Sequence, residues 1–327
     1  MRPIRAGILL AAILFSACGT SASQSASATN TASVLKGVAF SPPSSGVQAF
    51  LQALPALGGT LDWSGDWSEL GNTSGSPYQI SAMAKAQNLH LVVTVTAHRN
   101  SSPSKLLRPL DSQNLAAYLT DLDLYFAKFR PDYFGIGIEV NNLYQSDPAG
   151  YQSFVTLFAQ AQAKVKQLSP NTRVFVAFQL EEMKGLNGGL RGGQNDPAKN
   201  QWQLLADFPN ADLLAFTSYP FLIYHDPSQV PDNYYSEITA HTERPVAISE
   251  LGWPSAPVAT GWVSTAALQA QFITRFATLT QPVKPRFVLW LSAFDQPIAE
   301  PFTSIGLGAA DGAHKPAWDT WRSSSFS

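Results

Sequence analysis

Two glutamates stand where strand-like runs of apolar residues end. Glu139 closes DYFGIGIE (132–139), and Glu250 closes RPVAISE (244–250). A carboxylate that directly follows an apolar run is costly to bury unless it is used or is paired, for example with an arginine such as Arg99. Two facing carboxyl groups suit the cleavage of a glycosidic bond, because one can protonate the leaving oxygen while the other attacks the sugar or activates water. The two glutamates are therefore our candidate catalytic pair.

These glutamates belong to a series of eight short runs rich in apolar and β-branched residues. The runs are continuous rather than alternating, as expected of strands that are buried on both faces. Stretches with helical spacing and N-capping residues lie between them, as at 111–129, 147–168 and 264–279. The series predicts a single (β/α)₈ TIM barrel. The eight runs are 35–40, 59–63, 90–96, 132–139, 173–179, 212–218, 244–250 and 286–292.

A closed barrel would bring the two distant glutamates together. The 111 residues from Glu139 to Glu250 correspond to three strand–helix units, so the fourth and seventh strands lie across the barrel mouth from each other. Active sites of such barrels are built where the strands end. A doubly wound sheet is the main alternative, but AFSPPSSG (39–46), which follows the first run, lacks the glycine-rich turn of that fold.

The N-terminal residues have the composition of a targeting segment. Arg2 and Arg5 precede the apolar run AGILLAAILF, which is too short to span a bilayer and predicts a signal peptide over residues 1–17. Residues 18–33 contain no large apolar side chain, which predicts a flexible tether. The (β/α)₈ domain is expected to occupy residues 34–327.

Cys18 follows Phe-Ser-Ala at the end of the predicted signal peptide. This stretch resembles the lipobox of bacterial lipoproteins, in which cleavage leaves the cysteine as the lipidated first residue. Cys18 is the only cysteine and cannot form a disulfide within the chain, although ordinary cleavage beside an incidental cysteine is an alternative. We expect an extracytoplasmic lipoprotein, held to a membrane through Cys18 in the periplasm or on the cell surface.

The net charge and the spacing of the histidines limit the partners and cofactors to be expected. Charged residues make up 13% of the chain and the net charge is −2, which disfavours a nucleic-acid partner. The five histidines are scattered, and neither a phosphate-binding glycine loop nor a nucleophilic-serine motif is present. The sequence predicts no metal and no other cofactor, and we expect a monomer.

Several motifs in the second half of the chain resemble those of clan-A retaining glycoside hydrolases, which are (β/α)₈ enzymes. ISELGWPS (248–255) is similar to the nucleophile strand of endo-β-1,3-glucanases, S-E-T-G-W-P-S. FTSYPF (216–221) resembles the sixth strand of arabinogalactan endo-β-1,4-galactanases, S-Y-Y-P-F. FVLWLSAFDQP (287–297) and GLGAADGAHKPAWDTW (306–321) resemble the eighth strand and the closing segment of the clan. The first half of the chain resembles it through topology alone.

The resemblance implies a role for individual residues. Glu250 matches the nucleophile and Glu139 the general acid/base, so Glu250 is expected to be ionised and Glu139 to have a raised pKa. Tyr219 matches a tyrosine that hydrogen-bonds the nucleophile, and Trp290 matches a platform on which a sugar stacks. Two further indoles, Trp253 and Trp63, could line subsites or simply pack, as could Trp67.

Polar residues at the ends of the fourth and fifth strands are further candidates for substrate contacts. Asn141 lies two positions beyond Glu139 and should point to the same side of the chain. Gln179, Glu181 and Glu182 end the fifth run, where they could reach substrate hydroxyls or belong to a solvated loop.

Ile138 departs from the clan pattern, which has asparagine immediately before the acid/base. That asparagine usually holds the sugar 2-hydroxyl, a bond that strengthens in the transition state, and isoleucine cannot supply it. The favoured function is a retaining hydrolase of a β-linked oligo- or polysaccharide. The alternative is a carbohydrate-binding lipoprotein that has lost turnover; a solute-binding lipoprotein would need two lobes, which eight regular units disfavour.

Overall fold

The computed structural model describes residues 34–99, 102–259 and 261–326. The predicted signal peptide (1–17), Cys18 and the tether up to residue 33 lie outside the described residues. None of the helices in the described ranges combines the length and apolarity needed to cross a membrane.

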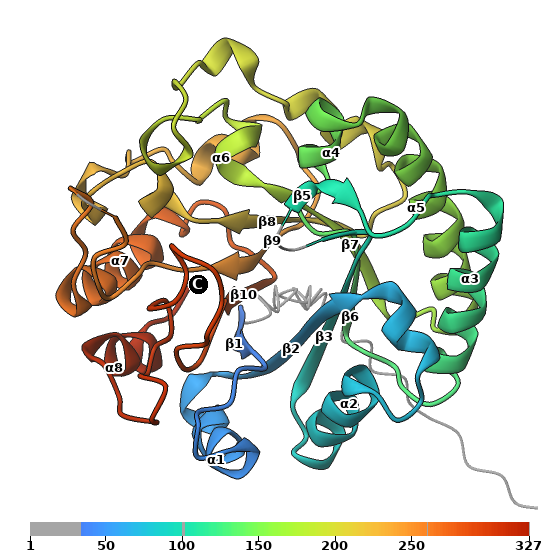
Figure 1. Ribbon diagram of the computed structural model, residues 1–327, viewed down its shortest axis with the longest axis horizontal. Helices are drawn as coiled ribbons and strands as arrows, with labels where there is room; N and C mark the ends of the chain where they lie inside the picture. Colours follow the sequence, from blue (N-terminus) through green and yellow to red (C-terminus); the bar gives the residue numbers. More distant parts are fainter. Residues whose placement is uncertain (1–33, 100–101, 260, 327) are drawn as a thin grey trace, which may run out of the picture. The chain divides into compact units, whose positions relative to one another are not determined.

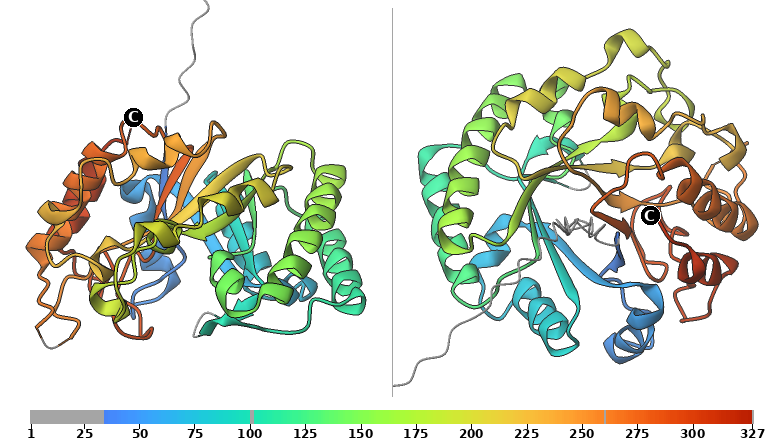
Figure 2. Two further views of the ribbon diagram at one scale, coloured as in Figure 1. Left: turned by 90° about the horizontal axis from the view of Figure 1, so that it is seen from above. Right: turned by 180° about the vertical axis from the view of Figure 1, so that it is seen from behind.

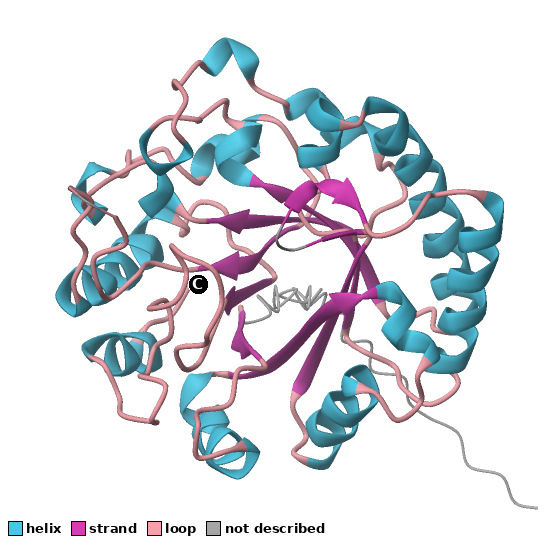
Figure 3. Ribbon diagram, in the orientation of Figure 1, coloured by secondary structure: helices cyan, strands magenta, loops and turns pink. Residues whose placement is uncertain are grey.

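Eight parallel strands close into a barrel, and every run predicted as a strand contributes one (Figures 1 and 3). Around the barrel the order is β1-β10-β9-β8-β7-β6-β3-β2, so that β1 pairs with both β2 and β10. The predicted (β/α)₈ fold is therefore confirmed. The strands are β1 (Leu35–Ala39), β2 (Gly59–Asp66), β3 (His90–Thr96), β6 (Tyr133–Ile136), β7 (Arg173–Gln179), β8 (Leu213–Ser218), β9 (Val246–Leu251) and β10 (Phe287–Trp290).

Helices surround the strands, as the two views in Figure 2 show. Two of the predicted helices start at the expected caps, where the side chains of Asp111 and Asp147 accept backbone N–H groups of the first turn. The third is capped in the same way by Thr265, one residue after the start of the predicted stretch. The α-helices are α1 (Val47–Leu57), α2 (Ser76–Ala86), α3 (Ser112–Phe126), α4 (Asn141–Ser146), α5 (Pro148–Leu168), α6 (Leu180–Met183), α7 (Ala266–Leu279) and α8 (Pro316–Ser323).

The regular alternation of strands and helices breaks down in two of the connections between successive strands of the barrel. The connection from β7 to β8 has only the single turn α6 followed by 3₁₀ turns, and β8 to β9 has 3₁₀ turns alone. Glycines and a proline interrupt the first connection at 185–197, and prolines interrupt the second at 220–231; both residue types disfavour a helix interior. The first connection leaves the mouth where β7 ends, and the second leaves it where β8 ends.

Strand side chains alternate between two cores. Those pointing inward fill the barrel itself with a small apolar cluster, while those pointing outward join the larger core beneath the helices. The interior cluster comprises Val92, Phe175, Ala177, Leu213, Ala215, Ala247, Phe287 and Leu289. A short antiparallel hairpin, β4 (His98–Arg99) with β5 (Ser102–Leu106), follows β3 at the mouth.

Candidate functional site

Strand β8 holds the two candidate glutamates together. Thr217 on β8 lies beside Glu250 in the β8–β9 register, and its hydroxyl donates a 2.7 Å hydrogen bond to Oε1 of Glu139. Two residues further along, the Tyr219 hydroxyl donates a 2.6 Å hydrogen bond to Oε2 of Glu250. Both glutamates are partly buried as whole residues and lie at one mouth of the barrel. Hydrolytic chemistry by two carboxylates requires this proximity.

A bulge in β9 aims the Glu250 side chain. Ile248 pairs with Phe216 on β8, but the next pair joins Glu250 to Thr217, so Ser249 is an extra residue in β9. Strict alternation from Ala247, which faces the barrel interior, would turn Glu250 outward toward the helices. Bulges commonly re-aim a side chain next to an active site. The extra residue keeps Glu250 at the mouth.

The backbone before Glu139 leaves the regular strand. The predicted strand extends to residue 139, whereas β6 ends at Ile136. Ala177 on β7 bonds the carbonyl of Gly137 and the N–H of Val140, which leaves Ile138 and Glu139 looping out of the ladder. Gly137 has φ 89° and Glu139 has φ 50°. Glutamate rarely adopts this left-handed conformation, so the surrounding bonds must hold it there.

Neighbouring polar groups support this loop. The Asn142 amide donates to Oε2 of Glu139 at 3.1 Å, on the opposite side of the carboxylate from Thr217. The buried imidazole of His98 hydrogen-bonds through Nε2 to the carbonyl of Ile138. The Ile138 side chain is only 8% exposed, so this position supports the loop and offers little surface to a ligand.

Burial and mutual repulsion raise the pKa of both glutamates. The pKa of Glu250 rises to about 8, first through burial and next through the charge of Glu139, while the Tyr219 hydrogen bond opposes the shift. Burial also raises the pKa of Glu139, against the hydrogen bond from Thr217 and the charge of Arg191. Burial and the neighbouring charge thus disfavour the ionised form that was expected of Glu250. The raised pKa expected for Glu139 agrees with the structure.

Two further acidic groups lie close to the pair. Glu182 forms an ion pair with Arg191, and the charge of Glu139 contributes to raising its pKa after burial. Asp62 on β2 is buried, accepts hydrogen bonds from Ser64 and Thr94, and has its pKa raised by burial to about 7. Neither Glu139 nor Glu250 forms an ion pair with a side chain that the structure describes, and the side chain of Arg99, the alternative partner, lies outside that part.

Trp290 and Trp253 cannot stack against a sugar in this structure. Trp290 points outward from β10 into the core beneath the helices and is fully buried, with its indole N–H donating to the Ile305 carbonyl at 2.8 Å. Trp253 is 1% exposed, packs on Phe272 and donates to Ser264. The two predicted subsite residues are structural, because neither presents a ring face to the mouth.

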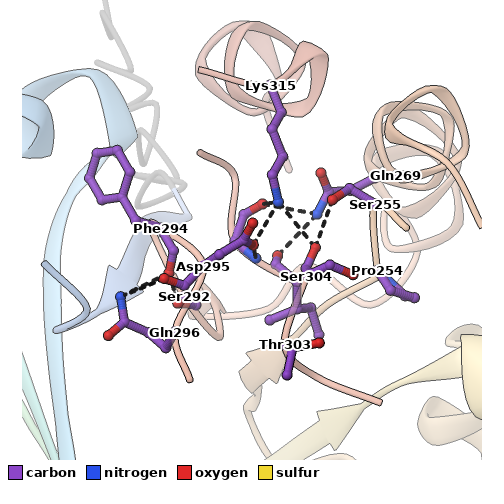
Figure 4. Close-up of polar contacts among 12 residues, drawn as sticks. Pro254, Ser255, Gln269, Ser292, Phe294, Asp295, Gln296, Thr303, Ser304 and Lys315 are labelled. Carbon is purple, nitrogen blue, oxygen red and sulfur yellow. Dashed lines mark hydrogen bonds and ion pairs between the residues drawn. The ribbon is translucent and has the colours of Figure 1, made fainter. Parts of the chain in front are cut away.

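Hydrogen bonds from Lys315 hold the loop that follows Trp290 (Figure 4). The Lys315 ammonium bonds Asp295 at 2.6 Å and the carbonyls of Ser304 and Gly306 at 3.1 and 2.9 Å. The same loop carries Phe302, a partly exposed ring whose centroid lies 5.0 Å from that of Tyr219. Phe302 thus stands beside the tyrosine that holds Glu250, a position that sequence motifs did not reveal.

Trp63 lines a cavity at the mouth end of β1 and β2. The cavity has a volume of about 210 Å³ and is smaller than typical drug-sized sites. Asp62 and Ser64 supply its polar lining, together with apolar atoms of Trp63 and Phe40. Only 5% of the Trp63 surface is exposed, so its contact with substrate stays a prediction that rests on its place in the lining of this cavity. Trp67, in contrast, is buried and stacks on Tyr118.

Asn141 and Gln179 are buried residues whose side chains are occupied by hydrogen bonds within the fold. Asn141 donates to Gln201 and to the Gln179 carbonyl, and it accepts the Gln179 N–H, so it ties α4 to β7. The Gln179 side chain caps α6 by accepting the Glu182 N–H and donates to Glu181. Their exposed fractions of 0% and 2% leave no room for the predicted substrate contact.

Sequence reasoning missed Thr217 and Asn142, which touch Glu139 directly. Thr217 follows Phe216 near the end of β8, which is the same signal that identified the glutamates, whereas Asn142 lies in α4, three positions beyond Glu139. In the described part of the chain, no group of three or more His, Cys, Asp or Glu side chains is arranged to hold a metal ion.

Comparison of the folds finds glycoside hydrolases among the solved structures that resemble this chain. The GH53 catalytic domain of Ignisphaera aggregans superposes with a TM-score of 0.63 at 16% identity, covering 89% of this chain and 96% of that domain. A β-1,3-glucanosyltransferase active-site mutant from Rhizomucor miehei, in complex with laminaritriose, gives 0.56 at 16% identity, with coverages of 86% and 95%.

A family 39 glycoside hydrolase from Bacteroides cellulosilyticus WH2 gives a TM-score of 0.61 at 15% identity. This chain aligns over 89% of its own length but spans only 63% of that enzyme. No family model and no curated protein sequence matches the chain. The comparisons confirm the resemblance to (β/α)₈ glycoside hydrolases at the level of the fold.

Replacing Gly137 with alanine should destabilise the fold. A Cβ there would lie 2.4 Å from both Phe154 Cζ and Val140 Cγ1 and would have to adopt φ 89°. We expect a loss of about 2–4 kcal/mol in the free energy of unfolding, measured by urea denaturation. Gly192→Ala is the matched control, because φ is 76° but no atom lies within 4 Å. Equal losses in the two variants would contradict the proposed crowding.

The raised pKa of Glu250 predicts how stability depends on pH. Its folded-state pKa of about 8 exceeds the unfolded value of about 4.3, so its contribution to stability is fully present below pH 4.3 and is lost as pH rises through 8. Thermal midpoints measured from pH 5 to 9 should therefore fall less in Glu250→Gln than in the wild type. The exposed Glu243→Gln variant should follow the wild type; parallel curves for all three would refute the assignment.

Proposed function

We propose that this protein is a retaining glycoside hydrolase that cleaves a β-linked oligo- or polysaccharide. The observation that carries the proposal is the arrangement of Glu139 and Glu250 around Thr217, with Tyr219 bonded to Glu250. The motif resemblance around Glu250 and the shared fold agree with this chemistry. The neighbour that binds laminaritriose shows that a related barrel accommodates a β-linked chain in its own site.

The proposed reaction has two displacements. Glu139 donates its proton to the glycosidic oxygen while Glu250 attacks the anomeric carbon, so that the bond to the leaving oxygen breaks and a glycosyl ester with Glu250 forms. Glu139, now ionised, takes a proton from water, which attacks the anomeric carbon and releases Glu250 as a carboxylate. Tyr219 supports the negative charge that Glu250 carries before the first step and regains in the second.

The pair must hold one proton between its two carboxyl groups for this reaction. Coupled groups titrate as a unit. The proton that is lost near pH 8 therefore belongs to the pair and not to Glu250 alone. When a substrate oxygen lies beside Glu139, the productive arrangement places that proton on Glu139 and the charge on Glu250. The rate should then decline above about pH 8, where the last proton is lost.

The charges around the site favour a neutral sugar. Asp62, Glu139 and Glu250 are acidic, and the nearby Arg191 is already paired with Glu182. A uronic acid unit would bring a further negative charge against these groups, which is unfavourable in a partly desolvated site. Neutral β-glucans and β-galactans are therefore the preferred candidate substrates.

Ile138 is the observation that favours a second candidate, a sugar-binding protein without turnover. Its side chain is buried and cannot bond the sugar 2-hydroxyl. Losing one such bond costs roughly one to two decades in rate, which would weaken hydrolysis without abolishing binding.

Release of reducing ends from β-glucan, β-galactan, polyuronate and aryl β-glycosides tests the hydrolase. We expect neutral substrates to react faster than polyuronate, and Glu250→Gln to lose about 10³-fold or more in kcat. Glu139→Gln should lose roughly 10²–10⁴-fold on substrates with poor leaving groups and less on activated aryl glycosides. Glu243→Gln serves as the surface control. Wild-type activity in Glu250→Gln would exclude this mechanism, while calorimetric sugar binding without turnover in any form would establish the second candidate.

We also propose that the mature protein is a lipoprotein anchored outside the cytoplasm through Cys18. The sequence Phe-Ser-Ala-Cys at residues 15–18 supports this proposal. Cys18→Ser should move the protein from the membrane to the soluble fraction after cell fractionation, with Ser16→Thr as a control that keeps the cysteine. Unchanged membrane association of Cys18→Ser would show that a lipid on Cys18 is not the attachment.

A further inference from the structure

Glu181 is a fully buried carboxylate directly beneath the candidate site, and no described residue neutralises it through an ion pair. It is the second residue of α6, the turn after β7, and is 0% exposed. The nearest cations are paired elsewhere, Lys184 with Glu237 and Arg191 with Glu182. An ionised group in this setting is costly unless hydrogen bonds replace the lost water.

Four donors surround the Glu181 carboxylate. Its Oε1 accepts the Tyr234 hydroxyl at 2.7 Å, the Tyr219 backbone N–H at 3.0 Å and the Ser218 hydroxyl at 3.2 Å. Its Oε2 accepts the side-chain amide of Gln179. The carboxylate therefore joins the end of β7 to the end of β8, where Tyr219 begins the turn out of the barrel.

The same tyrosine connects this buried group to Glu250. Its backbone is fixed by Glu181, and its hydroxyl donates the 2.6 Å bond to Glu250. The tyrosine has φ −132° and ψ 67° and is followed by Pro220, so regular strand pairing does not hold it. A shift of its backbone would move the hydroxyl relative to Glu250.

We propose that Glu181 is a positioning residue: its carboxylate fixes the Tyr219 backbone so that the Tyr219 hydroxyl stays bonded to Glu250. The inference extends the hydrolase proposed above and rests on it for its catalytic consequence. The positioning itself does not require turnover, because the ionisation of Glu250 reports it directly.

Glu181→Gln tests the positioning role, because a carboxylate accepts hydrogen bonds on both oxygens whereas an amide accepts on one end and donates on the other. The new NH₂ group would face the Gln179 amide, donor against donor, if its oxygen stayed on Tyr219. Gln179 cannot rotate its amide without losing the 2.7 Å bond from the Glu182 N–H. The opposite orientation of the new side chain would place NH₂ against the Tyr219 N–H. Either arrangement breaks the network, with almost no change of volume.

A ¹³C NMR titration of the Glu250 carboxyl, assigned by difference from Glu250→Gln, is the direct measurement. Because the Tyr219 hydrogen bond lowers the pKa of Glu250, we expect that pKa to rise in Glu181→Gln and in Tyr219→Phe. The other ionisable groups that act on Glu250, Glu139 and Asp62, are unchanged in both variants. In the double variant the rise should equal that of Tyr219→Phe alone, since Glu181 acts through Tyr219.

Asp212→Asn is the matched control. Asp212 is also a carboxylate that ties β7 to β8, through Lys166 and the Val174 N–H, but it lies at the opposite end of the barrel. The Asp212→Asn substitution should lower the thermal midpoint without changing the pKa of Glu250. If activity is found, Glu181→Gln should lose roughly tenfold in kcat with little change in KM, whereas Asp212→Asn should keep both.

The outcomes separate the inference from the proposed function. An unchanged Glu250 pKa in folded Glu181→Gln, or additive effects with Tyr219→Phe, would overturn the positioning role. If Glu181→Gln does not fold, Glu181→Asp replaces it, because the shorter side chain keeps the charge but cannot reach the Tyr219 N–H. A shifted pKa in a protein that cleaves no sugar would support the positioning role and remove only its catalytic consequence.

Discussion

Closure of the parallel sheet is the constraint on which the site depends. Once β1 is hydrogen-bonded to both β2 and β10, all eight strands must end at one mouth. Residues that are distant in sequence then become neighbours through register, as Thr217 shows by lying beside Glu250 and bonding Glu139. The mouth is also where interior side chains stop being covered, so polar groups can be satisfied there by neighbours or water.

The strands were predictable because burial on both faces leaves a strong signal in composition. All eight runs form strands, and the position of each glutamate at the end of its run follows from topology alone. The local deviations were not predictable, because they depend on contacts between strands. Strict alternation along β9 would turn Glu250 outward, and the extra residue Ser249 prevents this. Gly137 allows Glu139 to leave the hydrogen-bond ladder of its strand.

The aromatic and amide residues show a second limit of sequence reasoning. Trp290 has the residue type of a sugar platform, but strand alternation turns it outward, and its N–H supports the loop that carries Phe302. Asn141 and Gln179 have the chemistry to bind hydroxyl groups, but buried backbone and side-chain groups take up that capacity. The residue type determines which hydrogen bonds a side chain can form. Its buried neighbours determine which of these bonds it makes.

The hydrogen bonds made by buried residues explain how the fold tolerates two unfavourable features of the site. Glu139 has a left-handed backbone and Glu250 has a carboxyl group that burial and repulsion disfavour as an anion. Each is stabilised by neighbours that are themselves fixed from below: Thr217 by the β8 ladder and Tyr219 by Glu181. A site that keeps like charges close together needs this rigid support, because a looser one would relax by separating them. The buried polar network beneath the mouth is therefore the condition under which two adjacent carboxyl groups can persist in the folded barrel.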